Sequence, residues 1–266
     1  KSLPFKWAKY MDWLDIVRSK KIGVNETLVI YGYEQEHIDQ VAAMFCRAGY
    51  KNVKVYYNFL EEWVESNFPL VKLKRYKNLV PASWVFALLN GEKPQHYEND
   101  HFILLHAHYR NKEAYLSGHI PGAIDINTND VESPETWNRR SPEELKACFE
   151  EHGITEDTTV ILYGKFMFPD NDAEFPGSAA GHIGAIRTAF ILMWAGIKDV
   201  RVLNGGFQSW KDAGYDIETR DVPKIPIPNY TGKIPLRTEL VVDVPEAKEM
   251  LASNDAELVC IRSWSE

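Results

Sequence analysis

Thiols are the side chains in this sequence best suited to covalent chemistry, and there are three, at Cys46, Cys148 and Cys260. They are odd in number and far apart, so they do not form a disulfide framework, and no Cys-x-x-Cys pair provides a thiolate zinc site. Cys46 and Cys148 fall on predicted apolar helix faces, where a free cysteine is usually buried and inert. Cys260 falls inside a predicted strand, away from the anion-cradling loop that lowers a thiol pKa. We therefore expect none of the three to be a nucleophile.

Histidines form a second group, in the pattern His101-x4-His106-x-His108. His106 and His108 share one face of a predicted strand, so they have the spacing of a metal-binding pair. No carboxylate or other third ligand follows at a spacing that would complete a metal site. We therefore interpret these side chains as surface or hydrogen-bonded histidines. Neither the Gly177–Gly181 segment nor Gly164-Lys165 has the spacing of a nucleophile elbow or a phosphate loop. The sequence therefore predicts no metal and no cofactor.

Composition excludes several classes of function. The 266 residues carry a net charge of −8 with a pI of about 5.6, and 45% of them are hydrophobic. An acidic chain without a dense Lys/Arg run is a poor nucleic-acid binder. No stretch reaches the roughly 18 apolar residues of a membrane span, and no signal-peptide pattern is present. These features are typical of a globular protein with neither a nucleic-acid nor a membrane partner.

An internal repeat organises the chain. The 16 residues from Ala48 to Trp63 share six identities with those from Ala195 to Trp210. Upstream, the run that ends in Tyr31-Gly32 matches the run that ends in Tyr163-Gly164. Tyr163 follows Tyr31 by 132 residues, whereas Ala195 follows Ala48 by 147 residues, so the second copy carries a 15-residue insertion after its Tyr-Gly pair.

Each copy has the pattern of a strand, a helix and a second strand. The run before Tyr-Gly is short and rich in β-branched residues, which is typical of a strand buried on both faces of a parallel sheet. The next segment places apolar residues on one helical stripe: Ile38, Val41, Ala42, Phe45 and Ala48. Ala-Gly then ends the helix, and Val53–Val55 or Val200–Val202 begins the next strand. Such βαβ units predict the α/β fold class.

Further elements are predicted between and after the copies. Helices are expected over 81–90, from Ser141-Pro142 onwards, and over 244–251; strands are expected over 102–105, 124–126 and 257–261. The segment Val222–Pro228 contains three prolines and predicts an extended linker rather than a helix. We expect the residues after it to begin a new module, of which this chain would hold only the beginning.

Two motifs then suggest a family. The first comprises His108-Tyr109-Arg110, Glu113-Ala114-Tyr115 and Gly118-His119-Ile120-Pro121-Gly122-Ala123. The second runs from Val200 through Gly205-Gly206 to Trp210. Both resemble signatures of the rhodanese family, whose first motif begins with Asp-x-Arg where this chain has His108. The residues that carry the resemblance, and that we expect to be structural, are Arg110, Gly118, His119, Pro121, Gly122, Gly205, Gly206 and Trp210.

The resemblance implies tandem modules, each a parallel sheet flanked by helices. Residues 1–75 resemble the later part of one module, 76–225 a complete second module, and 226–266 a linker and the beginning of a third. The whole chain is similar to bacterial, periplasmic, multi-module thiosulfate sulfurtransferases. In these proteins the last module carries the active cysteine, so we expect it downstream of Glu266. The implied substrates are thiosulfate and a thiol or cyanide acceptor, and the chain should contact the missing parts of modules one and three.

In active members of the family, the nucleophilic cysteine directly follows the aromatic residue that ends the strand. The corresponding positions here are Gly32 and Gly164, which supply no sulfur. The loop over 165–182 carries three acids, at Asp170, Asp172 and Glu174, and a net-negative loop is a poor receptor for an anion. We expect it to cover the silent site in preference to contacting a neighbouring module. Arg187 occupies the position of a family arginine, and we expect it to bind carbonyls at the end of the sheet or a carboxylate rather than an anionic substrate.

Two functional hypotheses remain, with a third behind them. The first is the non-catalytic part of a thiosulfate sulfurtransferase. The second is a non-enzymatic rhodanese-like scaffold that binds a partner through its acidic insertion. The third, a rhodanese-fold phosphatase, needs a Cys-x5-Arg loop and lacks the cysteine at either degenerate position. Whether the encoded protein continues with a cysteine loop decides between the first two.

Overall fold

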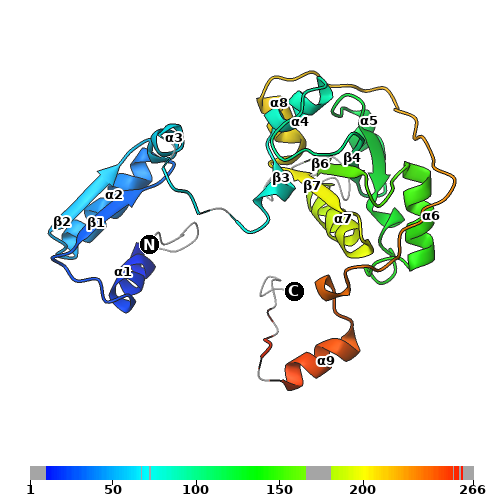
Figure 1. The fold of residues 1–266 in the computed structure, drawn as a ribbon. Helices are drawn as coiled ribbons and strands as arrows, with labels where there is room; N and C mark the ends of the chain where they lie inside the picture. Colours follow the sequence, from blue (N-terminus) through cyan, green and yellow to red (C-terminus); the bar gives the residue numbers. More distant parts are fainter. Residues whose placement is uncertain are drawn as a thin grey trace. The chain divides into compact units, whose positions relative to one another are not determined.

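The computed structural model describes residues 10–66, 68–71, 73–165, 181–253, 255–257 and 259. The chain divides into two compact units, residues 1–73 and 74–266, of which Figure 1 shows the elements. The sequence predicted the first boundary two residues later. It also predicted a separate part from residue 226 onwards, whereas the structure places the described residues of that part in the second unit.

Unit 1 contains α1 (Tyr10–Ser19), β1 (Thr27–Tyr31), α2 (Gln35–Arg47), β2 (Asn52–Tyr56) and α3 (Phe59–Glu65). Strands β1 and β2 pair in parallel, with Leu28 beside Val53, as the repeat predicted. Helices α1 and α2 cover one face of this pair with a small core of Leu14, Val17, Val41, Phe45 and Tyr50. The predicted stripe on α2 therefore faces the strands.

The other face of β1 corrects one expectation. Val29 and Tyr31 are 53% and 42% exposed, although the sequence predicted a strand buried on both faces. The physical reason is that the core of the described part of unit 1 lies between the two strands and helices α1 and α2. On the other face the ring of Phe59 in α3 contacts Tyr31, but no full helical layer covers the described strands, as one normally does in a parallel sheet.

Unit 2 is built on a five-stranded sheet in the order β3-β7-β6-β4-β5. All neighbouring strands are parallel. The strands are β3 (Leu79–Val80), β4 (Phe102–His108), β5 (Ile124–Asn127), β6 (Thr159–Gly164) and β7 (Asp199–Leu203). Every residue of the central strand β6 is buried, as expected for a parallel strand between two helical layers. The predicted α/β fold is confirmed.

Two helical layers enclose this sheet. On one face, α6 (Pro142–His152) and α7 (Gly181–Ala195) form a core that includes Leu145, Phe149, Leu162 and Leu192. On the other, α4 (Ala82–Leu89) and α8 (Gly206–Asp212) pack around Tyr163 and Trp210. The short elements are η1 (Tyr76–Asn78), α5 (Glu113–Leu116), η2 (Thr128–Asp130), η4 (Thr238–Leu240) and α9 (Val244–Ala252). Among the described residues, no helix has the length and apolarity that crossing a bilayer requires.

Most predicted elements of unit 2 are present within a few residues. The helix α4 lies inside the predicted range 81–90, and α9 covers the predicted range 244–251. At the start of α6, Ser141 accepts a hydrogen bond from the Glu144 N–H while Glu144 bonds back to the Ser141 N–H, a capping box. The strand predicted over 257–261, with Cys260, lies largely outside the described residues, as does the inserted loop from residue 166 to 180.

The proline-rich segment is extended as predicted, but it is attached to unit 2 along its length. We call residues 221–237 the strap. The Val222 N–H donates to the Tyr115 hydroxyl, and the Ile227 N–H donates to the Glu150 carbonyl. Farther on, the ring of Tyr230 packs against Phe149, with 2% of its surface exposed. The strap is therefore part of the folded unit rather than a free linker.

Candidate functional site

The position where a family member would carry its nucleophile lies at the carboxyl end of β6. Gly164 is the last residue of that strand, and α7 begins across from it at Gly181. A Cβ on Gly164 would overlap the Gly181 carbonyl group and lie 2.8 Å from the His182 nitrogen. Real Cβ atoms do not approach backbone so closely. The backbone therefore occupies the space in which a side chain at residue 164 would begin.

A third glycine completes this contact. Gly206, at the start of α8, has φ +57°, and a Cβ there would lie 2.7 Å from the Gly164 oxygen and 2.8 Å from His182 Nδ1. We call Gly164, Gly181 and Gly206 the glycine junction. Because glycine alone permits such close approach, these residues bring the ends of β6, α7 and α8 together. The N–H of His182 also donates to the Lys165 carbonyl across the junction.

The equivalent position in unit 1 differs. Gly32 follows β1, and a Cβ there would meet only the Ile38 side chain, at 3.4 Å. A side chain would thus fit at Gly32, although the sequence provides no sulfur there. The two positions thus differ in the space around them. Neither glycine supplies a nucleophilic atom, and at Gly164 backbone atoms also fill the space of a side chain.

Arg187 on α7 is engaged by the protein itself. Its guanidinium forms an ion pair with Glu132, and its Nη2 donates to the Trp137 carbonyl at 3.1 Å. Glu132 is 5% exposed; burial raises the pKa of its carboxyl, and the Arg187 charge offsets part of this rise. These are the carbonyl and carboxylate contacts that the sequence analysis favoured over anion binding.

The first signature motif forms a turn that locks two distant segments together. His119 Nδ1 hydrogen-bonds to the Tyr115 carbonyl at 3.0 Å, and the His119 backbone pairs with Glu218 in both directions. The Glu218 carboxylate accepts from the Gly122 N–H, and this bond lowers the pKa of Glu218. Pro121 lies between these contacts. The turn requires glycine at Gly118 and Gly122, whose φ angles are +154° and +76°.

The remaining signature residues are also explained by structure. Arg110 has φ +59°; its N–H donates to Asn127 Oδ1, and its exposed guanidinium lies over the Tyr109 ring. Gly205, with φ +80°, precedes α8, and Trp210 is buried with its Nε1 donating to the Asp216 carbonyl. The structure brings Gly164 and Gly206 together in the glycine junction, whereas Arg110 and Trp210 act elsewhere in the unit.

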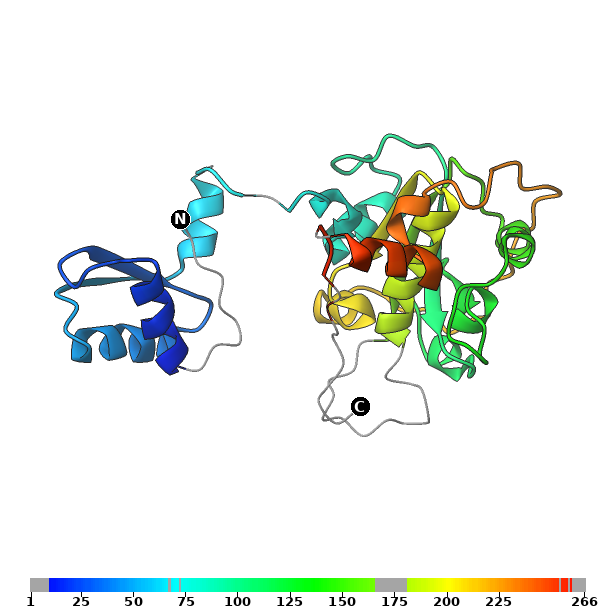
Figure 2. The same ribbon diagram turned by 90° about the horizontal axis from the view of Figure 1, so that it is seen from below.

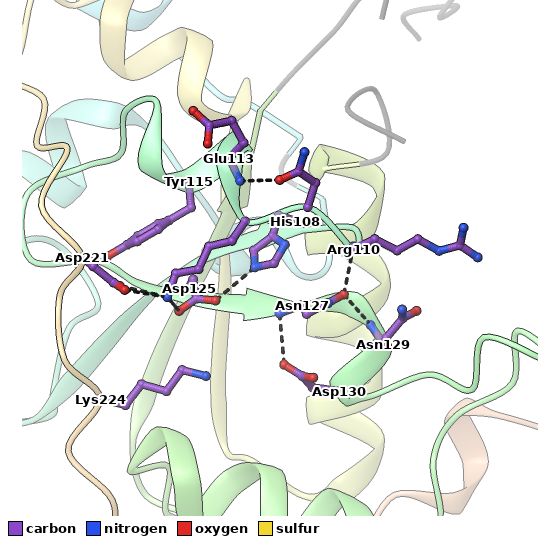
Figure 3. A network of polar contacts seen from close by, with 12 residues as sticks. His108, Arg110, Glu113, Tyr115, Asp125, Asn127, Asn129, Asp130, Asp221 and Lys224 are labelled. Carbon is purple, nitrogen blue, oxygen red and sulfur yellow. Dashed lines mark hydrogen bonds and ion pairs between the residues drawn. The ribbon is translucent and has the colours of Figure 1, made fainter. Parts of the chain in front are cut away.

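A polar network that the sequence analysis missed lies beside the end of β4 (Figure 3). Asp125 on β5 accepts from His108 Nε2 at 3.0 Å and from Lys112 Nζ at 3.1 Å, and Lys112 also reaches Asp221 at 2.9 Å. Burial by itself would raise the pKa of Asp125, but the bonds from His108 and Lys112 outweigh it and hold the pKa well below its usual range. One feature of the sequence could have indicated this network: Asp125 is an acid between two isoleucines in a predicted strand. The network ties the strap to the sheet.

His106 corrects the interpretation of the histidine group. It is fully buried, and neither ring nitrogen has a hydrogen-bond partner among the described residues. Burial lowers its pKa to about 3, with the neighbouring His108 and His119 adding to the effect. It was predicted to be exposed or hydrogen-bonded, but the aromatic rings of Tyr115, Tyr163 and Phe207 surround it instead. Within the part of the chain that the structure describes, no group of three or more His, Cys, Asp or Glu side chains is placed to hold a metal.

The two described cysteines differ in burial. Cys148 is buried, as predicted, and burial raises the pKa of its thiol strongly. Cys46 is exposed, so its predicted burial was wrong. It follows Phe45 by one residue on α2, which turns it about 100° away from the side that faces the core. Cys46 belongs to unit 1 and Cys148 to α6 of unit 2, and Cys260 is outside the described residues.

Comparisons with known proteins agree with the motifs. Residues 109–213 match the rhodanese-like domain. The chain is 34% identical over 251 residues to the thiosulfate sulfurtransferase YnjE of Escherichia coli, covering 94% of this chain and 53% of that protein. It is 33% identical over 164 residues to the sulfur carrier protein TtuD of Thermus thermophilus, covering 61% of this chain and 48% of that protein. The chain thus spans about half the length of these curated relatives.

Solved structures show a further similarity. The anaerobic ergothioneine biosynthesis enzyme of Chlorobium limicola, in complex with trimethyl histidine, is 58% identical with a TM-score of 0.74. This chain is covered completely, and it covers 63% of that chain. The same values hold for a structure of EanB with ergothioneine covalently linked to a cysteine persulfide. The chain belongs to the rhodanese-like family.

Proposed function

We propose that this chain is the non-catalytic portion of a sulfurtransferase whose persulfide-carrying cysteine lies outside residues 1–266. The observation that carries the proposal is the glycine junction. At Gly164, where the family places its nucleophile, backbone atoms of Gly181 and His182 fill the space of a side chain. Unit 2 would then support a neighbouring catalytic module rather than react itself.

The described thiols add support. A sulfurtransferase needs an accessible thiolate beside backbone N–H groups or a helix N-terminus that lower its pKa. Cys148 is buried with a raised pKa, and Cys46 lies in the last turn of α2, at the end of the helix dipole that disfavours a negative charge. Neither meets the requirement. In the proposed reaction the thiolate outside this chain attacks the sulfane sulfur of thiosulfate, the S–S bond breaks, and sulfite leaves with the bonding electrons.

The proposal also names the compound that accepts the sulfur from the persulfide. We propose a trimethylated histidine, because two structures with 58% identity over this entire chain contain that compound or its sulfur-bearing product ergothioneine. The outer persulfide sulfur would bond to a ring carbon while the S–S bond breaks and its electron pair leaves on the cysteine sulfur. The proton lost from that carbon would pass to the released thiolate, and the thiol would be restored. Thiosulfate-to-cyanide transfer is the second candidate, favoured by the 34% identity to YnjE.

The test uses the full-length protein and the 266-residue chain side by side. Each is incubated with thiosulfate or polysulfide as donor and with trimethylhistidine or cyanide as acceptor. Ergothioneine is measured by liquid chromatography with mass spectrometry, and thiocyanate is measured by its iron complex. We expect product from the full-length protein and none above background from residues 1–266.

Each outcome has one meaning. Thiocyanate without ergothioneine would favour the second acceptor. A full-length protein that never forms a persulfide would overturn the proposal and favour the scaffold hypothesis, in which the family fold only binds a partner. Turnover by the 266-residue chain would also overturn it. The periplasmic location implied by the resemblance stays a prediction, and cell fractionation tests it.

A further inference from the structure

One side of helix α7 carries apolar side chains that the described protein leaves uncovered. Ile183, Ile186 and Phe190 are 62%, 49% and 40% exposed and follow one another at i, i+3 and i+7, so they lie on one face. We call them the α7 stripe. The opposite side of α7 is buried in the core of unit 2. A helix that is apolar on every side is normally enclosed on every side.

The cation that lies within the α7 stripe is already neutralised. Arg187 lies between Ile183 and Phe190 on the helix, and its guanidinium is paired with the buried carboxylate of Glu132. A protein surface that covers the α7 stripe would therefore not bury an unpaired charge there, which is the main cost of covering a charged face. The stripe has the composition of an interface core, in which apolar residues surround a satisfied arginine.

The path of the chain shows what lies nearest to this face. At the end of the strap, the N–H groups of Leu236 and Arg237 both donate to the Trp194 carbonyl at the end of α7. Arg139 then fixes the start of α9: its guanidinium lies over the Trp194 ring and donates to Asp243 at 2.9 Å. The polypeptide thus passes the carboxyl end of α7 immediately before α9 (Figure 2).

Helix α9 is itself incompletely packed. None of its residues is buried, and Met250 and Leu251 are each 47% exposed. The connection to unit 1 enters elsewhere: residues 74–80 lead through β3 into α4, which packs on the opposite face of the sheet from α7. The polypeptide that continues from α9 is therefore the segment delivered to the α7 side.

We propose that the α7 stripe is the docking face for the part of a further rhodanese-like module that lies beyond residue 266 in the full-length protein. This inference rests on the proposed function, which places the persulfide cysteine in that module. Its length is consistent with the similar solved chains, of which this chain covers 63%. Docking on α7 would hold the catalytic module against unit 2 while the strap and α9 fix its point of attachment.

The experiment compares charged variants in two lengths of the protein. Ile186→Glu and Phe190→Glu are made in the full-length protein and in the 266-residue chain. Ile225→Glu serves as the matched control, because Ile225 is 81% exposed on the strap. Exposed positions of this kind tolerate substitution, so unit 2 should remain folded in every variant. Hydrodynamic radius, sedimentation and the rate of limited proteolysis after residue 253 are measured.

We expect the two stripe variants to expand the full-length protein and to speed cleavage after residue 253 about tenfold, because cleavage follows the undocked population and a carboxylate is costly in an apolar contact. The control and both variants of the 266-residue chain should match their parents. Expansion of the 266-residue chain would instead assign the stripe to a segment within it, and loss of a dimer would assign it to a second copy. Either result, or no change at all, would overturn the proposal.

The readout does not depend on catalysis. If the full-length protein opens on substitution but transfers no sulfur, the proposed function fails and the docking face stands. If sulfur transfer is present while the stripe variants leave compactness and cleavage unchanged, the docking face fails and the proposed function stands.

Discussion

The carbonyl group of Gly181 lies in the space that a side chain on Gly164 would enter. The two glycines are separated in the sequence by the inserted loop, yet their backbones meet where β6 ends and α7 begins. This contact excludes a nucleophile from the family position more strictly than the change of residue type alone. It also makes the position sensitive to the smallest substitution.

We expect Gly164→Ala to lower the free energy of unfolding of unit 2 by about 1–3 kcal/mol, because the added methyl forces the start of α7 away from β6. Gly164→Cys should cost at least as much and should not create sulfurtransferase activity. Gly32→Ala is the matched control, since a Cβ there meets only the Ile38 side chain at an ordinary distance. The measurement is urea unfolding followed by hydrogen exchange of β6. A Gly164→Cys protein that folds normally and transfers sulfur would contradict the account of the site.

Buried His106 should make unit 2 sensitive to acid. Burial lowers its pKa from 6.5 to about 3, so the unfolded chain binds the proton first as the pH falls below 6.5. The free energy of unfolding should therefore decrease by about 1.4 kcal/mol from this group between pH 7.5 and 5.5. It should continue to decrease until the folded protein is also protonated, near pH 3.

The variant His106→Phe tests this dependence. Phenylalanine retains a ring among Tyr115, Tyr163 and Phe207 but cannot bind a proton. Its stability should change less with pH than that of the parent. Equal slopes in the two proteins would show that His106 is not the group that titrates. Hydrogen exchange of β4 at the two pH values is the measurement.

Asp125 should contribute far more to the free energy of unfolding than Asp221, although both carboxylates bind Lys112. The Asp125 side chain is 10% exposed and also binds His108, whereas the Asp221 side chain is 57% exposed. Breaking the buried pair with Asp125→Asn should cost about 3–5 kcal/mol. The exposed pair lost in Asp221→Asn should cost about 0–1 kcal/mol. Urea unfolding of the two variants compares these costs directly. Equal decreases in the free energy of unfolding would contradict the expectation that the more buried carboxylate contributes more.

The strap should contribute to the stability of unit 2. Tyr230 packs on Phe149 in α6, so Tyr230→Ala should cost about 3–5 kcal/mol and speed hydrogen exchange throughout α6. Ile225→Ala, on the same strap but 81% exposed, should change stability by less than about 0.5 kcal/mol. If both variants leave α6 equally protected, the strap is a free linker, as the sequence alone suggested for Val222–Pro228.

Local sequence patterns predicted most helices and strands, because such elements depend largely on interactions between residues close together in the sequence. The apolar stripe of α2 and the capping residues of α6 depend on neighbours within a few positions, and both appear as predicted. The burial of His106 and the overlap at Gly164 depend on segments far apart in the chain, so spacing could not reveal them. The two repeat tyrosines show the same limit. Tyr31 and Tyr163 each lie beside a phenylalanine of the helix after the next strand, but Tyr31 is 42% exposed and Tyr163 is fully buried.

The two described thiols should differ in their reactivity. Cys46 is exposed on α2 and should react with a thiol reagent in the folded chain. Cys148 should react only on unfolding, because burial raises the pKa of its thiol and blocks access. Peptide mapping by mass spectrometry separates these sites from Cys260. After incubation with thiosulfate, neither peptide should carry an added sulfur atom, since exposure at Cys46 is not accompanied by a helix N-terminus that stabilises a thiolate. Persulfide on Cys46, removed by Cys46→Ser together with sulfur transfer, would place a reactive site in unit 1 and refute the silent assignment.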